Sequence, residues 1–400
     1  QWASIGGVFW LSFWVMFVNL LAYRIVQAKN KIRASAIWCG CALLPYFFGW
    51  VHPFFIQRWM EEWREIRVAL IQTAMLPEQR NYTRLYPLEF IHPIDQWNRV
   101  LDLLKASEAY DLIVLPESAF PYGAGVPLMA YEPARLTWLH HYGDESERAL
   151  PPFEPPYVFL SQVEGKERRK VSNAFFAQAL ANQFRTDVII GLDDQDAAGK
   201  YNAAFHFRPG ARADRYEKRI LVPVAEYLPL KGVNFLAAFY AKNYHIFDSC
   251  TPGREAKVFG ARIPIAPSIC YEETYSSLIR EQRVKGAKLL VNVSNDVWYP
   301  DSNLPEQHFY HGRIRAAENG VFLVRACNTG VTAVVDCFGK SLAMLAVSDH
   351  QPGVLDYKFP LRAYPTLYML WGDTAILALS VFFLIAYFGK KLLLRNRKLS

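Results

Sequence analysis

The chain has 400 residues, enough for one large domain or two ordinary ones, and 52% of them are hydrophobic while only 20% are charged. Its formal net charge is +7, but nine of the 44 basic residues border long apolar runs near the ends. The other 35 basic residues are fewer than the 37 acidic residues. The positive charge therefore does not indicate a nucleic-acid partner. The nine are Arg24, Lys29, Lys31, Arg33, Lys390, Lys391, Arg395, Arg397 and Lys398.

Three apolar runs lie near the ends of the chain, at residues 2–23, 34–51 and 366–388. About 20 apolar residues cross a bilayer as a helix, so we expect three transmembrane helices rather than core helices or a signal peptide. Short basic loops mark the cytoplasmic side. The predicted organisation is two transmembrane helices with a cytoplasmic basic loop at 1–52, an exported domain at 53–365, and a transmembrane helix with a cytoplasmic tail at 366–400.

Strand-like and helix-like segments alternate in the predicted exported domain. The strand pattern falls at 67–72, 111–115, 186–192, 202–208, 262–269, 287–293, 321–327 and 331–335, and the helix pattern at 93–106, 274–285 and 307–320. This alternation predicts an α/β or layered α+β domain with buried sheets. Two stretches do not fit a compact core: residues 122–169, and residues 228–253, which suit either contact with lipid or a flap over the core.

One cysteine occupies an unusual place, at the end of the apolar strand pattern and one residue away from two acids, in the stretch APSICYEETYS. A structural cysteine would more naturally lie inside the apolar run, where a thiol packs as a small hydrophobic group. A nucleophile is better placed at the strand-to-helix corner, where its backbone is held rigidly. Cys270 is thus a candidate nucleophile, with a buried structural thiol as the alternative. No metal-binding C-x-x-C spacing is present, and the pairing of Cys250, Cys327 and Cys337 is left open.

Two charged residues could assist such a thiol. Glu117 follows the strand pattern in LIVLPESAF and could act as a general base, or could simply begin a helix. Lys218 lies in DRYEKRILVPVAEYLP and could stabilise an oxyanion, although a lone lysine is usually solvated. An unperturbed thiol is only slightly ionised near neutral pH, so a base and a cation beside it would activate it. Together the three residues predict nucleophilic acyl transfer without histidine.

Two histidines offer a competing arrangement. His308 and His311 lie three residues apart on one predicted helix, where they could bind a metal or form a Cys–His dyad. No third ligand motif accompanies them. We therefore interpret His308 as a residue that satisfies polar core groups, and we expect no metal and no cofactor.

The segments LPES, YEKRILVPVAEYLP and SICYE, in this order, resemble the nitrilase (carbon–nitrogen hydrolase) superfamily. VNVSNDVWY and QHFYHGRIRAAENGVFLVRACNTGVTAVVDCFGK resemble the apolipoprotein N-acyltransferases within it, as do QWASIGGVFWLSF and TLYMLWGDTAI near the ends. The resemblance covers the chain from Gln1 to about residue 388. It implies an αββα sandwich on the periplasmic side of a bacterial inner membrane.

The resemblance also implies the reaction and the site. A fatty acyl chain passes from a phospholipid to a cysteine thioester, and from there to the α-amino group of an S-diacylglyceryl-cysteine on a lipoprotein. By position, Glu117 matches the family's base, Lys218 its lysine and Cys270 its nucleophile. Glu226, Tyr271 and Glu272 match positions that support the active site.

The chain departs from the family pattern in its three expected spans, where about eight are usual, and in the length of residues 122–169. We expect a truncated or shortened relative, whose acceptor could differ, as in relatives among conjugal-transfer membrane proteins. Two further hypotheses remain open: a membrane-anchored amidase that hydrolyses a small amide, and an inactive scaffold.

Overall fold

The computed structural model describes residues 1–82, 88–105, 108–163, 166–230, 235, 249–260, 262–298, 302–345 and 351–396. Its helices are α1 (Ala3–Gln27), α2 (Lys31–Ile56), η1 (Gln57–Trp59), α3 (Pro77–Arg80), α4 (Pro93–Leu103), α5 (Tyr131–Tyr142), η2 (Asp144–Ala149), α6 (Asn173–Phe184), η3 (Cys270–Thr274), α8 (Ser276–Val284), α9 (Leu304–Asn319), α10 (Leu367–Trp371) and α11 (Thr374–Asn396). Its strands are β1 (Glu61–Gln72), β2 (Leu112–Leu115), β3 (Met129–Ala130), β4 (Val158–Val163), β5 (Lys166–Val171), β6 (Asp187–Asp196), β7 (Gly199–Arg208), β8 (Ala211–Glu217), β9 (Ile265–Ile269), β10 (Leu289–Ser294), β11 (Phe322–Cys327), β12 (Ala333–Val335), β13 (Ser341–Met344) and β14 (Gly353–Ala363).

Two sheets pack face to face at the centre of the molecule. One has the strand order β14-β1-β2-β6-β7-β8 and the other β13-β12-β11-β10-β9. Val68, Val114 and Ile189 of the first sheet share a buried cluster with Val291 and Val324 of the second. These strands are apolar on both faces because each sheet is also covered on its outer side, as is usual for buried parallel strands.

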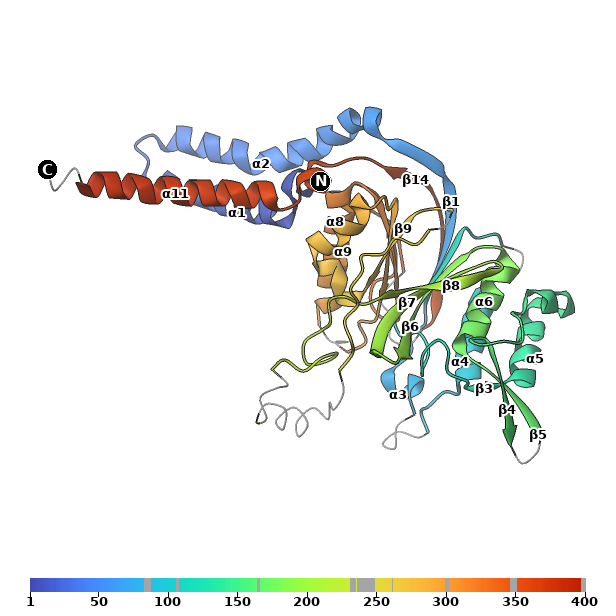
Figure 1. The fold of residues 1–400 in the computed structure, drawn as a ribbon. Coiled ribbons are helices and arrows are strands. Elements are labelled where there is room, and N and C mark those ends of the chain that lie inside the picture. The colour runs from blue at the N-terminus through green and yellow to red at the C-terminus, as the bar shows by residue number, and fades with distance from the viewer. Residues whose placement is uncertain are drawn as a thin grey trace.

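Helices cover both outer faces, which completes an αββα sandwich (Figure 1). Trp97 of α4 and Phe176 of α6 stack against each other over the six-stranded sheet. Leu278 of α8 and Phe309 of α9 pack over the five-stranded sheet. The alternation of strands and helices read from the sequence is therefore correct, and so is the layered architecture.

The terminal helices α1, α2 and α11 extend together away from the sandwich (Figure 1). Two helices, Ala3–Gln27 and Lys31–Trp59, are long and apolar enough to cross a membrane by length and composition. In the third expected run, α10 ends at Trp371 and α11 follows from Thr374 to Asn396; the apolar stretch among the residues whose side chains are described is Thr374–Lys390. Within the part of the chain that the structure describes, two spans thus pass this test instead of three.

A pair of antiparallel strands joins these helices to the sandwich. β1 follows α2 and η1 directly, and β14 leads to α10 and α11. Their register runs from Glu61 opposite Ala363 to Gln72 opposite Gly353. Both ends of the chain therefore enter the domain side by side at one edge of the six-stranded sheet.

The expectation that residues 122–169 lie outside the compact core is wrong. This stretch contains β3, α5, η2, β4 and most of β5, and Tyr131, Trp138 and Val158 belong to the same buried cluster as α4 and α6. Its helical spacing is hard to see because only a narrow stripe of α5 is buried between charged residues. Most of the second stretch, residues 231–234 and 236–248, lies outside the described residues.

Candidate active site

The predicted nucleophile lies where the sequence pattern places it, at the corner between β9 and η3. Cys270 follows the fully buried strand and is itself partly exposed. Its φ of 50° is unusual for a residue with a Cβ and costs about 1–3 kcal/mol unless the surroundings hold it. Asn292 of the neighbouring strand β10 donates to the Cys270 carbonyl oxygen at 3.3 Å. The corner is therefore a fixed feature of the sheet edge.

Lys218 lies at the centre of a buried polar cluster. Its Nζ lies 3.1 Å from Glu117 Oε1 and 2.8 Å from Glu226 Oε1. Asn202 Nδ2 donates to the same two oxygens, at 2.6 Å and 2.8 Å. The lysine side chain is 1% exposed, so its charge is balanced by protein groups rather than by water. The structure thus brings together three of the residues singled out from the sequence and adds Asn202.

A glycine in the neighbouring strand makes the position of Glu117 possible. Gly191 of β6 exchanges backbone hydrogen bonds with the segment around Glu117, accepting from Ala119 N–H and donating to the Pro116 carbonyl. A Cβ at Gly191 would lie 2.5 Å from Glu117 Cα and 2.6 Å from the Pro116 oxygen. Only glycine allows the two backbones to come this close.

The resting site favours a protonated thiol and a charged lysine. Burial raises the pKa of the Cys270 thiol, and the Glu117 carboxylate raises it further, while Lys218 and a hydrogen bond with Ser294 oppose them. Burial alone would lower the pKa of Lys218, but the negative groups around it outweigh burial and raise that pKa. Cys270 therefore needs a base to take its proton before it can act as a nucleophile.

Glu272 connects the nucleophile's corner to the segment that follows the lysine. Its buried carboxylate accepts hydrogen bonds from the backbone N–H groups of Ile269 at 2.9 Å, Arg219 at 2.6 Å and Ile220 at 3.2 Å, and from the Tyr216 hydroxyl at 2.9 Å. Burial raises the pKa of Glu272, although these donors counteract it. The contacts fix the distance between the two parts of the site without touching the thiol.

The other two residues expected to support the site differ in depth. Glu226 contacts Lys218 directly, and its Oε2 accepts from the Val222 backbone N–H at 2.7 Å. Tyr271 lies at the partly exposed rim, where its hydroxyl accepts from the Tyr275 hydroxyl at 3.1 Å.

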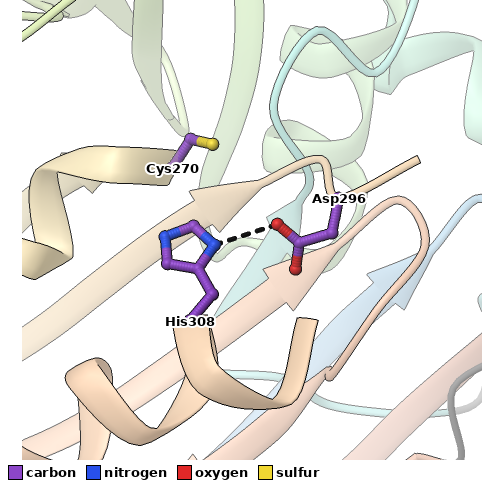
Figure 2. Close-up of side chains that lie close together, drawn as sticks. All are labelled: Cys270, Asp296 and His308. Carbon is purple, nitrogen blue, oxygen red and sulfur yellow. Dashed lines mark hydrogen bonds and ion pairs between the residues drawn. The ribbon is translucent and has the colours of Figure 1, made fainter. Parts of the chain in front are cut away.

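A second buried cluster lies beside Cys270 and was not anticipated as a unit (Figure 2). His308 Nδ1 lies 2.9 Å from Asp296 Oδ1, and His308 Nε2 lies 3.1 Å from Glu273 Oε1. Arg325 contacts both carboxylates, at 3.0 Å and 3.1 Å. The interpretation of His308 as a residue that satisfies polar core groups agrees with these contacts, but the groups are charged and lie next to the candidate nucleophile.

Cys270, Asp296 and His308 also form a set of side chains with the chemistry of metal ligands. One donor atom from each lies within 4.8 Å of the others. However, Asp296 already pairs with Arg325 and His308, and the guanidinium supplies positive charge at the place where an ion would bind. Asp296, the carboxylate of this set, is thus engaged with cations of the chain itself.

The sequence offered weak signals for the residues it did not identify. Asn202 opens an alternating strand pattern, and Asp296 follows the end of β10 as Glu117 follows the end of β2. Polar residues at the ends of neighbouring strands meet at one edge of a sheet, which could have pointed to Asp296. Glu273 and Arg325 carried no such signal. Cys327 and Cys337 are buried free thiols, which answers the pairing question for these two.

The sequence model of the carbon-nitrogen hydrolase family matches residues 67–360, which includes every residue of both clusters. The chain belongs to this family. Within it, the chain is 32% identical to an apolipoprotein N-acyltransferase of Chlamydia caviae over 417 aligned residues, covering 99% of this chain and 71% of that protein. It is 36% identical to an apolipoprotein N-acyltransferase of Methylococcus capsulatus over 372 residues, covering 91% of this chain and 68% of the relative.

These relatives confirm the resemblance read from the motifs and support an acyltransferase enzyme. Among solved structures, the chain is similar to a CN-hydrolase superfamily protein from Xanthomonas campestris, with 17% identity and a TM-score of 0.47, covering 74% of this chain and 91% of that one. The two N-acyltransferases named above are longer than this chain, which spans about 70% of their length. The activity of the whole relatives is therefore treated below as a proposal.

Proposed function

We propose that this carbon-nitrogen hydrolase transfers a fatty acyl chain from a membrane phospholipid to the α-amino group of an S-diacylglyceryl-cysteine at a lipoprotein N-terminus. The observation that carries the proposal is the buried Glu117–Lys218–Glu226 cluster beside Cys270, in a chain similar to apolipoprotein N-acyltransferases over nearly its whole length.

In the first half-reaction, Glu117 takes the proton of the Cys270 thiol and the sulfur attacks the ester carbonyl of the phospholipid. Lys218, charged and pointing at the same carboxylate, stabilises the negative oxygen of the tetrahedral intermediate. When the intermediate collapses, the carbon–oxygen bond breaks and the leaving lysophospholipid takes the proton from Glu117. The products are an acyl-Cys270 thioester and a neutral alcohol.

In the second half-reaction, the acceptor amine attacks the thioester carbonyl and gives a proton to Glu117. The carbon–sulfur bond then breaks, and Glu117 returns the proton to the Cys270 sulfur. An amide and the free thiol result, and no cofactor is needed for the atoms and protons to balance. Glu226 and Asn202 serve as positioning residues, because Glu226 binds the lysine and Asn202 donates to the base and to Glu226.

Both substrates are lipids, and the arrangement of the chain suits them. Two helices that meet the length and composition of a membrane span extend away from the sandwich (Figure 1), and the chain enters and leaves the domain at one edge. We infer that α1, α2 and α11 anchor the domain in the bacterial inner membrane, with residues 53–365 on the periplasmic side. The basic loop between α1 and α2 supports this orientation.

A membrane-anchored amidase is the second candidate, because water could resolve the same thioester. Intact-protein mass spectrometry separates the two. Detergent-solubilised chain is incubated with phosphatidylethanolamine alone, and a fatty-acyl adduct that is labile to hydroxylamine and absent in Cys270→Ala is expected. A diacylglyceryl-cysteine peptide should then remove the adduct and gain its mass. A folded protein that forms no adduct would refute the acyltransferase and leave the amidase or an inactive scaffold.

A further inference from the structure

We propose that His308 is a charged positioning residue that keeps the buried cluster beside Cys270 electrically neutral and thereby permits the Cys270 thiolate to form. The inference rests on the proposed role of Cys270 as nucleophile, but on neither the acyl donor nor the acceptor.

The contacts of His308 place an acid at each ring nitrogen. Nδ1 lies 2.9 Å from Asp296 Oδ1, in the loop after β10, and Nε2 lies 3.1 Å from Glu273 Oε1 in η3. The Glu273 contact is an ion-pair distance without hydrogen-bond geometry, and Arg325 Nη2 lies 3.1 Å from Nδ1. Burial and Arg325 disfavour the charged ring, but Glu273 and Asp296 outweigh them and raise the pKa of His308. The geometry therefore favours the imidazolium.

Charge counting shows why this proton matters. The cluster contains two acids, Glu273 and Asp296, and two bases, His308 and Arg325, all buried. Arg325 stays charged, because the same acids outweigh burial and raise its pKa, and Arg325 and His308 lower the pKa of Asp296 to about 2 even though burial opposes them. With His308 protonated the four groups sum to zero, and with His308 neutral they sum to −1.

A net negative charge at this place would act directly on the nucleophile. Donor atoms of Cys270, Asp296 and His308 lie within 4.8 Å of one another, and Figure 2 shows the imidazole close to both other side chains. Burial and Glu117 already raise the pKa of Cys270, and Asp296 adds to them. A charged imidazolium at His308 would offset the negative charge of Asp296.

The remaining titratable groups around His308 do not replace its charge. On α9 itself, burial lowers the pKa of His311, and Arg315 lowers it further, which keeps that ring neutral. On β11, burial raises the pKa of the Cys327 thiol, which stays protonated. His308 is therefore the group whose proton decides whether this cluster carries a net negative charge beside Cys270.

The test measures thiol ionisation without any lipid. The full chain in detergent is alkylated with iodoacetamide across a pH series, and the Cys270 peptide is followed by mass spectrometry. His308→Gln should slow alkylation near neutral pH about tenfold, which corresponds to a midpoint raised by one pKa unit. Glu273→Gln should lower the midpoint, and His308→Gln combined with Glu273→Gln should restore it towards wild type. His311→Gln, on the same helix, is the matched control and should leave the midpoint unchanged.

A structural role for His308 predicts a different pattern, because removal of a second contact would add to the damage. The proposal is overturned if the double variant reacts no faster than His308→Gln, or if Glu273→Gln alone raises the midpoint. This test is independent of the proposed reaction. If the alkylation pattern is as predicted but the mass spectrometry finds no phospholipid-derived adduct, the acyltransferase is refuted and the role of His308 still stands.

Discussion

Gly191→Ala offers a sharp test of how the site is positioned. The added Cβ would lie 2.5 Å from Glu117 Cα and 2.6 Å from the Pro116 carbonyl oxygen, both of them backbone atoms. Ordinary contacts begin at 3.4 Å, so β6 and the Glu117 corner must separate by about 0.9 Å. Overpacking of this kind costs about 1–3 kcal/mol, and a displacement of about 1 Å at a reacting group can lower the rate ~100-fold.

The assay is the rate of phospholipid-dependent Cys270 acylation, measured beside thermal unfolding of the same preparation. Gly191→Ala should acylate ~10- to 100-fold more slowly while remaining folded. Gly260→Ala is the matched control, since a Cβ there meets nothing within 4 Å. A folded Gly191→Ala that acylates at the wild-type rate would refute the claim that close backbone approach positions Glu117.

Three further predictions concern residues at increasing distance from the thiol. Glu272→Gln should slow acylation at least ~10-fold, because an amide NH₂ would face the backbone donor at Arg219, and the loss should appear in the acylation rate more than in lipid affinity. The pKa of Asp296 is lowered from its ordinary 3.8 to about 2, so its ionised carboxylate stabilises the folded state above pH 3.8 and this contribution is lost as the pH falls towards about 2. The thermal unfolding midpoints of wild type and Asp296→Asn should therefore converge in acid. Trp138→Ala should destabilise the domain by about 3–5 kcal/mol in denaturant unfolding, yet leave Cys270 alkylation of the folded protein unchanged.

The sequence predicted the parts of the site that follow strand ends. Glu117 and Cys270 each terminate an uninterrupted apolar run, and such runs are the clearest local signal of a buried strand. The alternation of strand and helix patterns predicted an α/β or layered α+β domain, and the family resemblance implied the αββα sandwich. Lys218 was a weaker candidate on the residues alone, because a lysine among other charged residues is usually solvated, and the family resemblance added weight to it.

What the sequence could not supply depends on contacts between distant segments. The partners of His308 lie 12 residues away at Asp296 and 17 at Arg325, on different elements. Arg325 interrupts an otherwise apolar strand, and nothing local indicates which acids would compensate it. Trp138 was missed for a related reason: its helix buries a narrow stripe, and the sheet against which it packs comes from other parts of the chain.

Helix α9 joins the membrane side of the molecule to the cluster beside the nucleophile. His308 lies near its start and Glu318 near its end, ten residues or about 15 Å apart along the axis. Glu318 accepts from the backbone N–H of Val8 in α1, and it pairs with Arg315 at 2.7 Å. Gly7, with φ of 71°, permits α1 to lie this close to Glu318 and Tyr368. A Cβ at Gly7 would lie 2.5 Å from the Tyr368 ring and 3.2 Å from Glu318 Oε1.

A rigid helix held at both ends carries a displacement from one end to the other. A change in how α1 sits against α9 would therefore move His308 relative to Cys270, although α1 itself touches neither. Through this connection, helix α1 could affect the position of His308 beside Cys270 in addition to anchoring the domain. It also implies that truncation of α1 should shift the alkylation midpoint of Cys270 in a preparation that thermal unfolding shows to be folded, and an unchanged midpoint would contradict the connection.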